Sequence, residues 1–219
     1  EYQNYAKKFH QAYKGRYKII EHIYPDVSKA QFVNKSQYSR TNMVFNYQPR
    51  KENYILVENY LPEDKPIVVL APRYRNGFKR NWNNWPAFYN KLANDKVLMD
   101  KFNFIICGKV GEYVPDTEHR FYDMNDIELG NNSSLIGILL VIMEKALFTF
   151  GSQSAIPNIS LIYEKEVLCF GCQKHLHTKT YNIKNTPITF FDDRRYNIEV
   201  NKVYHELKKL LLKKEKTNK

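Results

Sequence analysis

The sequence predicts an α/β fold in which helices cover both faces of a doubly wound parallel sheet. Short β-branched apolar runs, typical of strands buried on both faces, carry this prediction, because segments of helical length and periodicity separate them. The chain of 219 residues is 43% hydrophobic and 15% aromatic, which is enough for a sizeable core and excludes wholesale disorder.

Four strands are predicted, and the first of them, Ile67-Val68-Val69-Leu70-Ala71, has the clearest pattern. Gly108 and Gly151 directly follow the second and third strands, so both strands end at a residue that favours a turn. The predicted strands span residues 67–71, 102–107, 147–150 and 166–171.

Helices are predicted after and between these strands, at residues 85–98, 134–146, 156–163 and 199–214. Pro86 falls in the first turn of the first helix, where proline is well tolerated. The last helix has Val203, Leu207, Leu210 and Leu211 at the spacing of one apolar face, so we expect it to close the domain against the core.

A domain boundary is predicted between an N-terminal region, residues 1–64, and the α/β domain, residues 65–219. The segment Leu61–Pro66 is polar and holds two prolines, which resist continuation of a helix or a central strand. Within the N-terminal region, residues 17–23, 42–47 and 54–60 fit strands or short helices equally well.

A basic loop follows the first strand, at the end of the sheet where open α/β folds bind ligands. Between residues 71 and 80 it carries four cations and no carboxylate: Arg73, Arg75, Lys79 and Arg80. Guanidinium groups pair with phosphate oxygens in bidentate fashion, so this loop is typical of a diphosphate clamp. The alternative is a solvated loop in a basic protein.

Two further loops follow strands at the same end of the sheet. Gly108 and Gly111 allow a ligand to approach the backbone, and Glu112 can accept hydrogen bonds from ribose hydroxyls, although an ordinary turn fits as well. The turn of residues 151–155 places Ser152 and Ser154 before a helix, where unpaired N–H groups attract anions. Helix capping by either serine is the alternative, and both roles can hold together.

A cluster of cysteine and histidine lies at the end of the fourth strand. Cys169 and Cys172 have the spacing of a zinc half-site, and His175 and His177 follow. The histidines follow the cysteines too closely for the four side chains to surround a tetrahedral zinc ion, and no second pair of such ligands lies further along the sequence. We therefore expect no metal site. The histidines are expected to line the cleft or to lie on the surface.

Three segments together resemble a known family. Pro72 and Lys79–Pro86 resemble the "P…K-x-W-P" segment of the heptosyltransferase-like glycosyltransferases of family 9. Leu147–Pro157 resembles that family's "G-x-D-[ST]-G-x-x-H" turn, and Val167–Gly171 stands where the family has a "V-x-L-F-G" strand. The resemblance covers about residues 65–210 and implies the C-terminal, Rossmann-like donor-binding half of a GT-B enzyme.

The resemblance implies a glycosyltransferase that moves a sugar from a nucleoside diphosphate to an unknown acceptor, without a metal ion or other cofactor. The acceptor is a saccharide or, in view of the positive charge of the chain, modified DNA. The basic loop would hold the diphosphate, the serine turn would meet the phosphates or the sugar, and Gly108 and Glu112 would lie near the nucleoside. The donor-binding residues are then Arg73, Arg75, Lys79, Arg80, Gly108, Glu112, Ser152, Gln153, Ser154 and Ala155.

The chain departs from the family pattern in two respects. Gln153, Ala155 and Asn158 stand where the family has an acid, a glycine and a histidine. The family's catalytic base usually lies in the N-terminal domain, and residues 1–64 are too few for a full Rossmann half. We therefore assign no catalytic base and expect a remnant of an acceptor domain, a fragment, a reduced enzyme or one part of a two-chain protein.

Two other functions stay open, one suggested by charge and one by the departures at Gln153 and Ala155 and the short N-terminal region. The 34 Lys and Arg residues against 23 Asp and Glu leave a formal net charge of +11, and the lysine-rich C-terminus also suits a nucleic-acid-binding protein. A non-catalytic domain that keeps the fold is the third hypothesis. Three cysteines and the lack of an apolar run of about 18–20 residues favour a cytoplasmic protein without a membrane span.

Overall fold

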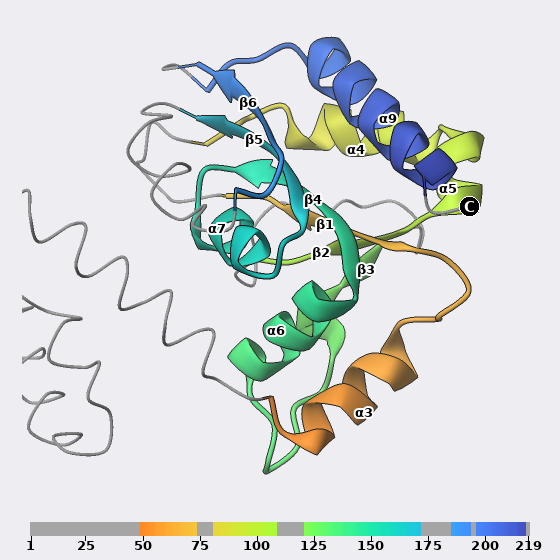
Figure 1. Cartoon of the computed structure of the whole chain (residues 1–219), viewed down its shortest axis with the longest axis vertical. Helices are drawn as coiled ribbons and strands as arrows, with labels where there is room; N and C mark the ends of the chain where they lie inside the picture. Colours follow the sequence, from red (N-terminus) through yellow and green to blue (C-terminus); the bar gives the residue numbers. More distant parts are fainter. Residues whose placement is uncertain (1–48, 74–80, 109–120, 172–184, 194–195, 218–219) are drawn as a thin grey trace, which may run out of the picture. The chain divides into compact units, whose positions relative to one another are not determined.

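The computed structural model describes residues 49–73, 81–108, 121–171, 185–193 and 196–217, all within one compact unit, Pro49–Lys219 (Figure 1). The elements in chain order are α3 (Lys51–Tyr60), β1 (Ile67–Ala71), α4 (Trp85–Ala93), α5 (Lys96–Lys101), β2 (Asn103–Ile106), β3 (Tyr122–Asp123), the 3-10 helix η2 (Met124–Asp126), α6 (Leu135–Lys145), β4 (Ala146–Ser152), α7 (Ala155–Ile162), β5 (Glu166–Gly171), β6 (Ile188–Asp192) and α9 (Val200–Thr217).

The strands form one six-stranded sheet in the order β3-β2-β1-β4-β5-β6, and every neighbouring pair is parallel. The chain moves outward from β1 to β3 and then returns to place β4 beside β1, so the direction of winding reverses between β1 and β4. This arrangement confirms the predicted doubly wound parallel sheet.

Helices cover both faces of the sheet. Figure 1 shows α4, α5 and α9 on one face and α6 and α7 on the other, with α3 packed against α6. Beneath α4 and α9 lies an aromatic core in which the rings of Trp82 and Phe170 are 5.0 Å apart and those of Phe88 and Phe150 are 4.9 Å apart. The apolar runs of the sequence are therefore buried between two helical layers.

The four predicted strands are confirmed as β1, β2, β4 and β5, and β4 extends past its expected end at Phe150 to Ser152. Predicted helices are confirmed as α6, α7 and α9. The single helix expected at residues 85–98 is wrong, because it is broken into α4 and α5. The Asp95 carboxylate accepts hydrogen bonds from the backbone N–H groups of Val97 and Leu98 and so starts a new helix there.

β3, η2 and β6 were not predicted, and α3 includes residues 54–60, which fitted either a strand or a short helix. β3 and β6 are the edge strands of the sheet. α3 precedes the boundary expected at Leu61–Pro66, yet it packs against α6 within the same unit. Residues 17–23 and 42–47 lie outside the described residues.

No helix in the described part of the chain is both long enough and apolar enough to cross a membrane.

Candidate functional site

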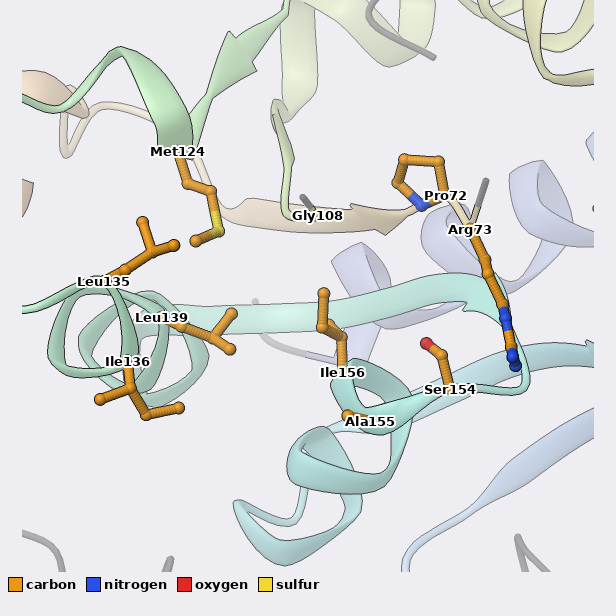
Figure 2. A pocket seen from close by; sticks show the side chains of 10 residues that line it. All are labelled: Pro72, Arg73, Gly108, Met124, Leu135, Ile136, Leu139, Ser154, Ala155 and Ile156. Atoms are coloured by element: carbon orange, nitrogen blue, oxygen red, sulfur yellow. The ribbon is translucent and has the colours of Figure 1, made fainter. Parts of the chain in front are cut away.

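A pocket of about 540 Å³ lies where the winding of the sheet reverses. Its walls come from the carboxyl ends of β1, β2 and β4, from η2, and from the first turns of α6 and α7 (Figure 2). The lining residues are Pro72, Arg73, Gly108, Met124, Leu135, Ile136, Leu139, Ser154, Ala155 and Ile156. This is the position at which open α/β sheets bind ligands.

β1 and β4 approach each other closely at the floor of this region. Ala71 pairs with Gly151, and a Cβ atom at Gly151 would lie 2.5 Å from the carbonyl oxygen of Ala71. Only glycine fits there. The loops that leave the two strands are therefore adjacent from their first residues.

Arg73 joins these two loops directly. Its Nη1 donates a hydrogen bond to the carbonyl oxygen of Gln153 at 3.0 Å, across 80 positions of sequence. Figure 2 shows the Arg73 side chain extending from the end of β1 to the turn that carries Ser154. Arg73, the first cation of the basic loop, and Ser154 of the serine turn thus line the same pocket.

Ser154 and Ala155 form the start of α7. Ser154 occupies the N-cap position with an extended backbone, φ −152° and ψ −171°, but its hydroxyl makes no capping hydrogen bond. Ser154 is half-buried and Ala155 is exposed. The first-turn N–H groups of a helix attract anions, so the polar end of the pocket combines a helix N-terminus with the Arg73 guanidinium.

The opposite end of the pocket is apolar. Met124, Leu135 and Leu139 gather there, away from Arg73 (Figure 2). Ser134 begins α6 by accepting a hydrogen bond from the N–H of Gly137 at 3.1 Å, and Leu135 follows with 42% of its surface exposed. This wall was not predicted from the sequence, although two apolar residues directly after a capping serine were the available signal.

Gly108 lines the pocket at the end of β2. The Nδ2 of Asn125 donates to the Gly108 carbonyl oxygen at 3.3 Å and to Asp123 Oδ1 at 2.8 Å. Asp123 thereby orients the amide that holds Gly108.

Ser152 and Gln153 are buried and are not among the lining residues. β4 continues through Ser152, and the N–H of Gln153 still donates to the Phe170 carbonyl oxygen at 2.8 Å. The Gln153 side chain lies against Gly171, where a Cβ atom would be 2.7 Å from Oε1. Because β4 continues to Ser152, the Gln153 side chain packs against β5.

Four of the candidate residues, Arg75, Lys79, Arg80 and Glu112, lie outside the described residues. Trp82, two positions after the loop, is fully buried and donates from Nε1 to the Ile198 carbonyl oxygen at 2.9 Å.

The cysteines that the structure describes are unsuited to nucleophilic or metal chemistry. Cys107 and Cys169 are buried and unpaired by disulfides, and burial raises the pKa of both thiols. Within the described ranges no group of three or more His, Cys, Asp or Glu side chains converges on a point. Cys172, His175 and His177 fall outside those ranges.

The fold and its pocket define a Rossmann-like, doubly wound domain of the kind that binds ligands at a switch point. The fold is that of part of a family 9 glycosyltransferase from Veillonella parvula, with a TM-score of 0.56 and 8% identity over 76% of this chain and 53% of that chain. The chain therefore spans about half the length of that protein.

The E. coli heptosyltransferase WaaC is also similar. Its complex with ADP-2-deoxy-2-fluoro heptose has a TM-score of 0.49 and 9% identity over 84% of this chain and 58% of that chain. Its complex with ADP has a TM-score of 0.45 and 10% identity over 84% and 57%. No protein-family model and no curated protein matches the chain.

Proposed function

We propose that this domain binds the diphosphate of a nucleoside-diphosphate sugar and serves in glycosyl transfer. The observation that carries the proposal is the pocket at the reversal between β1 and β4, in which Arg73 reaches the N-terminus of α7. The fold shared with part of a family 9 glycosyltransferase supports it.

The two ends of the pocket suit the two halves of such a donor. The Arg73 guanidinium and the N–H groups at the start of α7 would hold the phosphates, and Met124, Leu135 and Leu139 would pack on the nucleoside. Arg75, Lys79 and Arg80 would add charge from the same loop, and Glu112 would accept from the ribose.

Charge development explains how such an arrangement would speed the reaction. The leaving nucleoside diphosphate gains negative charge in the transition state, and fixed cations and amide donors stabilise that charge. In this proposal the compensating charge comes from side chains rather than from a metal ion or other cofactor. The acceptor is a saccharide or a nucleic acid. Because Cys107 and Cys169 are free thiols, we also propose a reducing, cytoplasmic compartment.

The proposal is tested by titrating the chain with UDP, GDP, ADP and CDP in a calorimeter. We expect one of them to bind, and Arg73→Ala to weaken that binding about 10- to 150-fold, since a charge-assisted hydrogen bond contributes about 1.5–3 kcal/mol. Arg75→Ala and Lys79→Ala should also weaken it.

Lys209→Ala is the matched control, because Lys209 is an exposed cation paired with Glu206 on its own helix. It should leave affinity unchanged. Failure of the unmodified chain to bind any nucleotide would refute the proposal. Donor binding without hydrolysis or transfer to any of a panel of acceptors would instead indicate a non-catalytic domain.

A further inference from the structure

Gln153 occupies a tight slot at the carboxyl end of β5. A Cβ atom placed on Gly171 would lie 2.7 Å from Gln153 Oε1, 2.8 Å from Gln153 Cβ and 2.9 Å from the Tyr196 hydroxyl oxygen. The Gln153 side chain therefore fills the space that the missing Gly171 side chain leaves, and only 6% of the residue is exposed.

Tyr196 closes the same slot from the other side. It has a φ of 52°, in the left-handed region that a tyrosine rarely adopts, and it is 2% exposed with its ring centroid 6.3 Å from that of Phe170. Its N–H donates to the Asp193 carbonyl oxygen at 3.3 Å, and the Asp193 N–H donates to the Gly171 carbonyl oxygen at 2.9 Å. Unfavourable backbone geometry at a buried position persists only where the surroundings hold it.

The backbone of Gln153 connects this slot to the pocket. Its N–H is held by the Phe170 carbonyl oxygen at 2.8 Å, and its own carbonyl oxygen accepts from Arg73 Nη1 at 3.0 Å. Two contacts therefore hold the Gln153 carbonyl group that orients the Arg73 guanidinium. One is the backbone hydrogen bond of Gln153 to β5, and the other is the packing of its buried side chain.

We infer that Gln153 is a positioning residue, locked by Gly171 and Tyr196, whose carbonyl oxygen aims the Arg73 guanidinium at the phosphates of the ligand. This inference rests on the proposed function. It gives Gln153 a role different from the direct contact with sugar or phosphate that the sequence suggests. Gln153 acts through Arg73, so its effect on binding must depend on Arg73.

A double-mutant cycle between Gln153 and Arg73 tests this dependence, with affinity for the nucleoside diphosphate bound by the unmodified chain as the readout. Gln153→Ala should weaken binding about fivefold when Arg73 is present and less than twofold in the Arg73→Ala background. The nucleoside without phosphates should bind with equal affinity to Gln153→Ala and to the unmodified chain. Gly171→Ala, which forces the Gln153 side chain out of its slot, should show the same dependence.

The outcomes separate the two claims. If the unmodified chain binds no nucleotide, the proposed function fails and the inference fails with it. If Arg73→Ala weakens binding but Gln153→Ala and Gly171→Ala do not, the inference alone is wrong. A Gln153→Ala loss that persists fully in the Arg73→Ala background indicates direct contact and also overturns it.

Asn53→Ala is the control for a buried amide outside the pocket, and it should leave affinity unchanged. Thermal unfolding of every variant shows whether it is folded at the temperature of the titration. If both Gln153→Ala and Gly171→Ala were unfolded, the conservative Gln153→Glu variant, which keeps the volume of the side chain, replaces them. Its change in nucleoside-diphosphate affinity should again be smaller in the Arg73→Ala background. If Gln153→Glu also lost affinity for the nucleoside without phosphates, the inference would be wrong.

Discussion

At the scale of single residues, Asp95 links three parts of the helical layer over the aromatic core: the start of α5, Tyr204 and Lys208. Its carboxylate caps α5 and accepts hydrogen bonds from the Tyr204 hydroxyl and from Lys208 Nζ, the latter at 2.6 Å. Burial opposes ionisation of Asp95, but the hydrogen bonds from Lys208, Tyr204 and the Leu98 N–H hold its pKa below the ordinary value. One side chain thereby breaks a helix and joins it to α9.

Asp95→Asn should therefore lower the free energy of unfolding at pH 7 by about 1–2 kcal/mol, because asparagine keeps the cap but loses the charge. A carboxyl group with a lowered pKa stabilises the folded state above its unfolded pKa of about 3.9, and that contribution is lost as the pH falls through the folded value. The difference between the unmodified chain and Asp95→Asn, measured by urea denaturation, should shrink below pH 4. A difference that stays constant from pH 7 to pH 3 would contradict this account.

At the scale of elements, α3 and α6 pack through an asparagine and a glycine. Asn53 is fully buried, and a Cβ atom on Gly137 would lie 2.6 Å from its Nδ2. Neither polar atom of the Asn53 side chain has a hydrogen-bond partner in the parts of the chain that the structure describes. The contact thus depends on shape, and the glycine in the first turn of α6 is explained by the space that Asn53 occupies.

Gly137→Ala should destabilise the fold by about 1–2 kcal/mol, because the overlap with Asn53 outweighs the gain of about 1 kcal/mol in helix propensity. The double variant with Asn53→Ala should recover that loss, since the space for the new methyl group is then free. Urea denaturation of the two single variants and the double variant measures both effects. If Gly137→Ala alone is stabilising, the packing described between α3 and α6 is wrong.

The elements that the sequence predicts are those with a strong local pattern. β1, β2, β4 and β5 lie inside the sheet and are almost wholly buried, so their apolar runs are continuous. β3 has only two residues, and β6 is half-buried at the opposite edge, so neither shows such a run. β3 and β6 are strands because they pair with β2 and β5, and the sequence pattern of a single segment does not reveal its pairing partner.

At the scale of the whole molecule, several of the positively charged side chains form ion pairs within the fold. On α9, Lys208 pairs with Asp95 at 2.6 Å and Lys214 with Glu166 at 3.1 Å, while Glu215 pairs with Lys101 at 2.6 Å. The lysine-rich C-terminal segment, which suggested nucleic-acid binding, is therefore also a helix bound to the domain by ion pairs.

We expect the chain to bind DNA only through general attraction to its net charge of +11. Fluorescence anisotropy with labelled duplexes should show an affinity that falls steeply between low and physiological salt and that is equal for unrelated sequences. A preference for one sequence or structure that survives at physiological salt would contradict this and favour a nucleic-acid-binding protein.

The candidate site could be predicted in its position and only partly in its residues. Strand ends of a parallel sheet share an edge, which is why Arg73, Gly108 and Ser154 could be assigned to one place. The inward turn of Gln153 depends on the length of β4 and on its packing against Gly171, and both are properties of the assembled sheet.

The hydrogen bond from Arg73 to Gln153 also has a consequence for how the protein is made. Its partners are 80 positions apart, so a growing chain on the ribosome cannot complete this pocket until β4 has been synthesised and has inserted beside β1. If the proposed function holds, nucleotide affinity would then report on completed folding, and a nascent chain that stops before β4 would not bind the nucleotide.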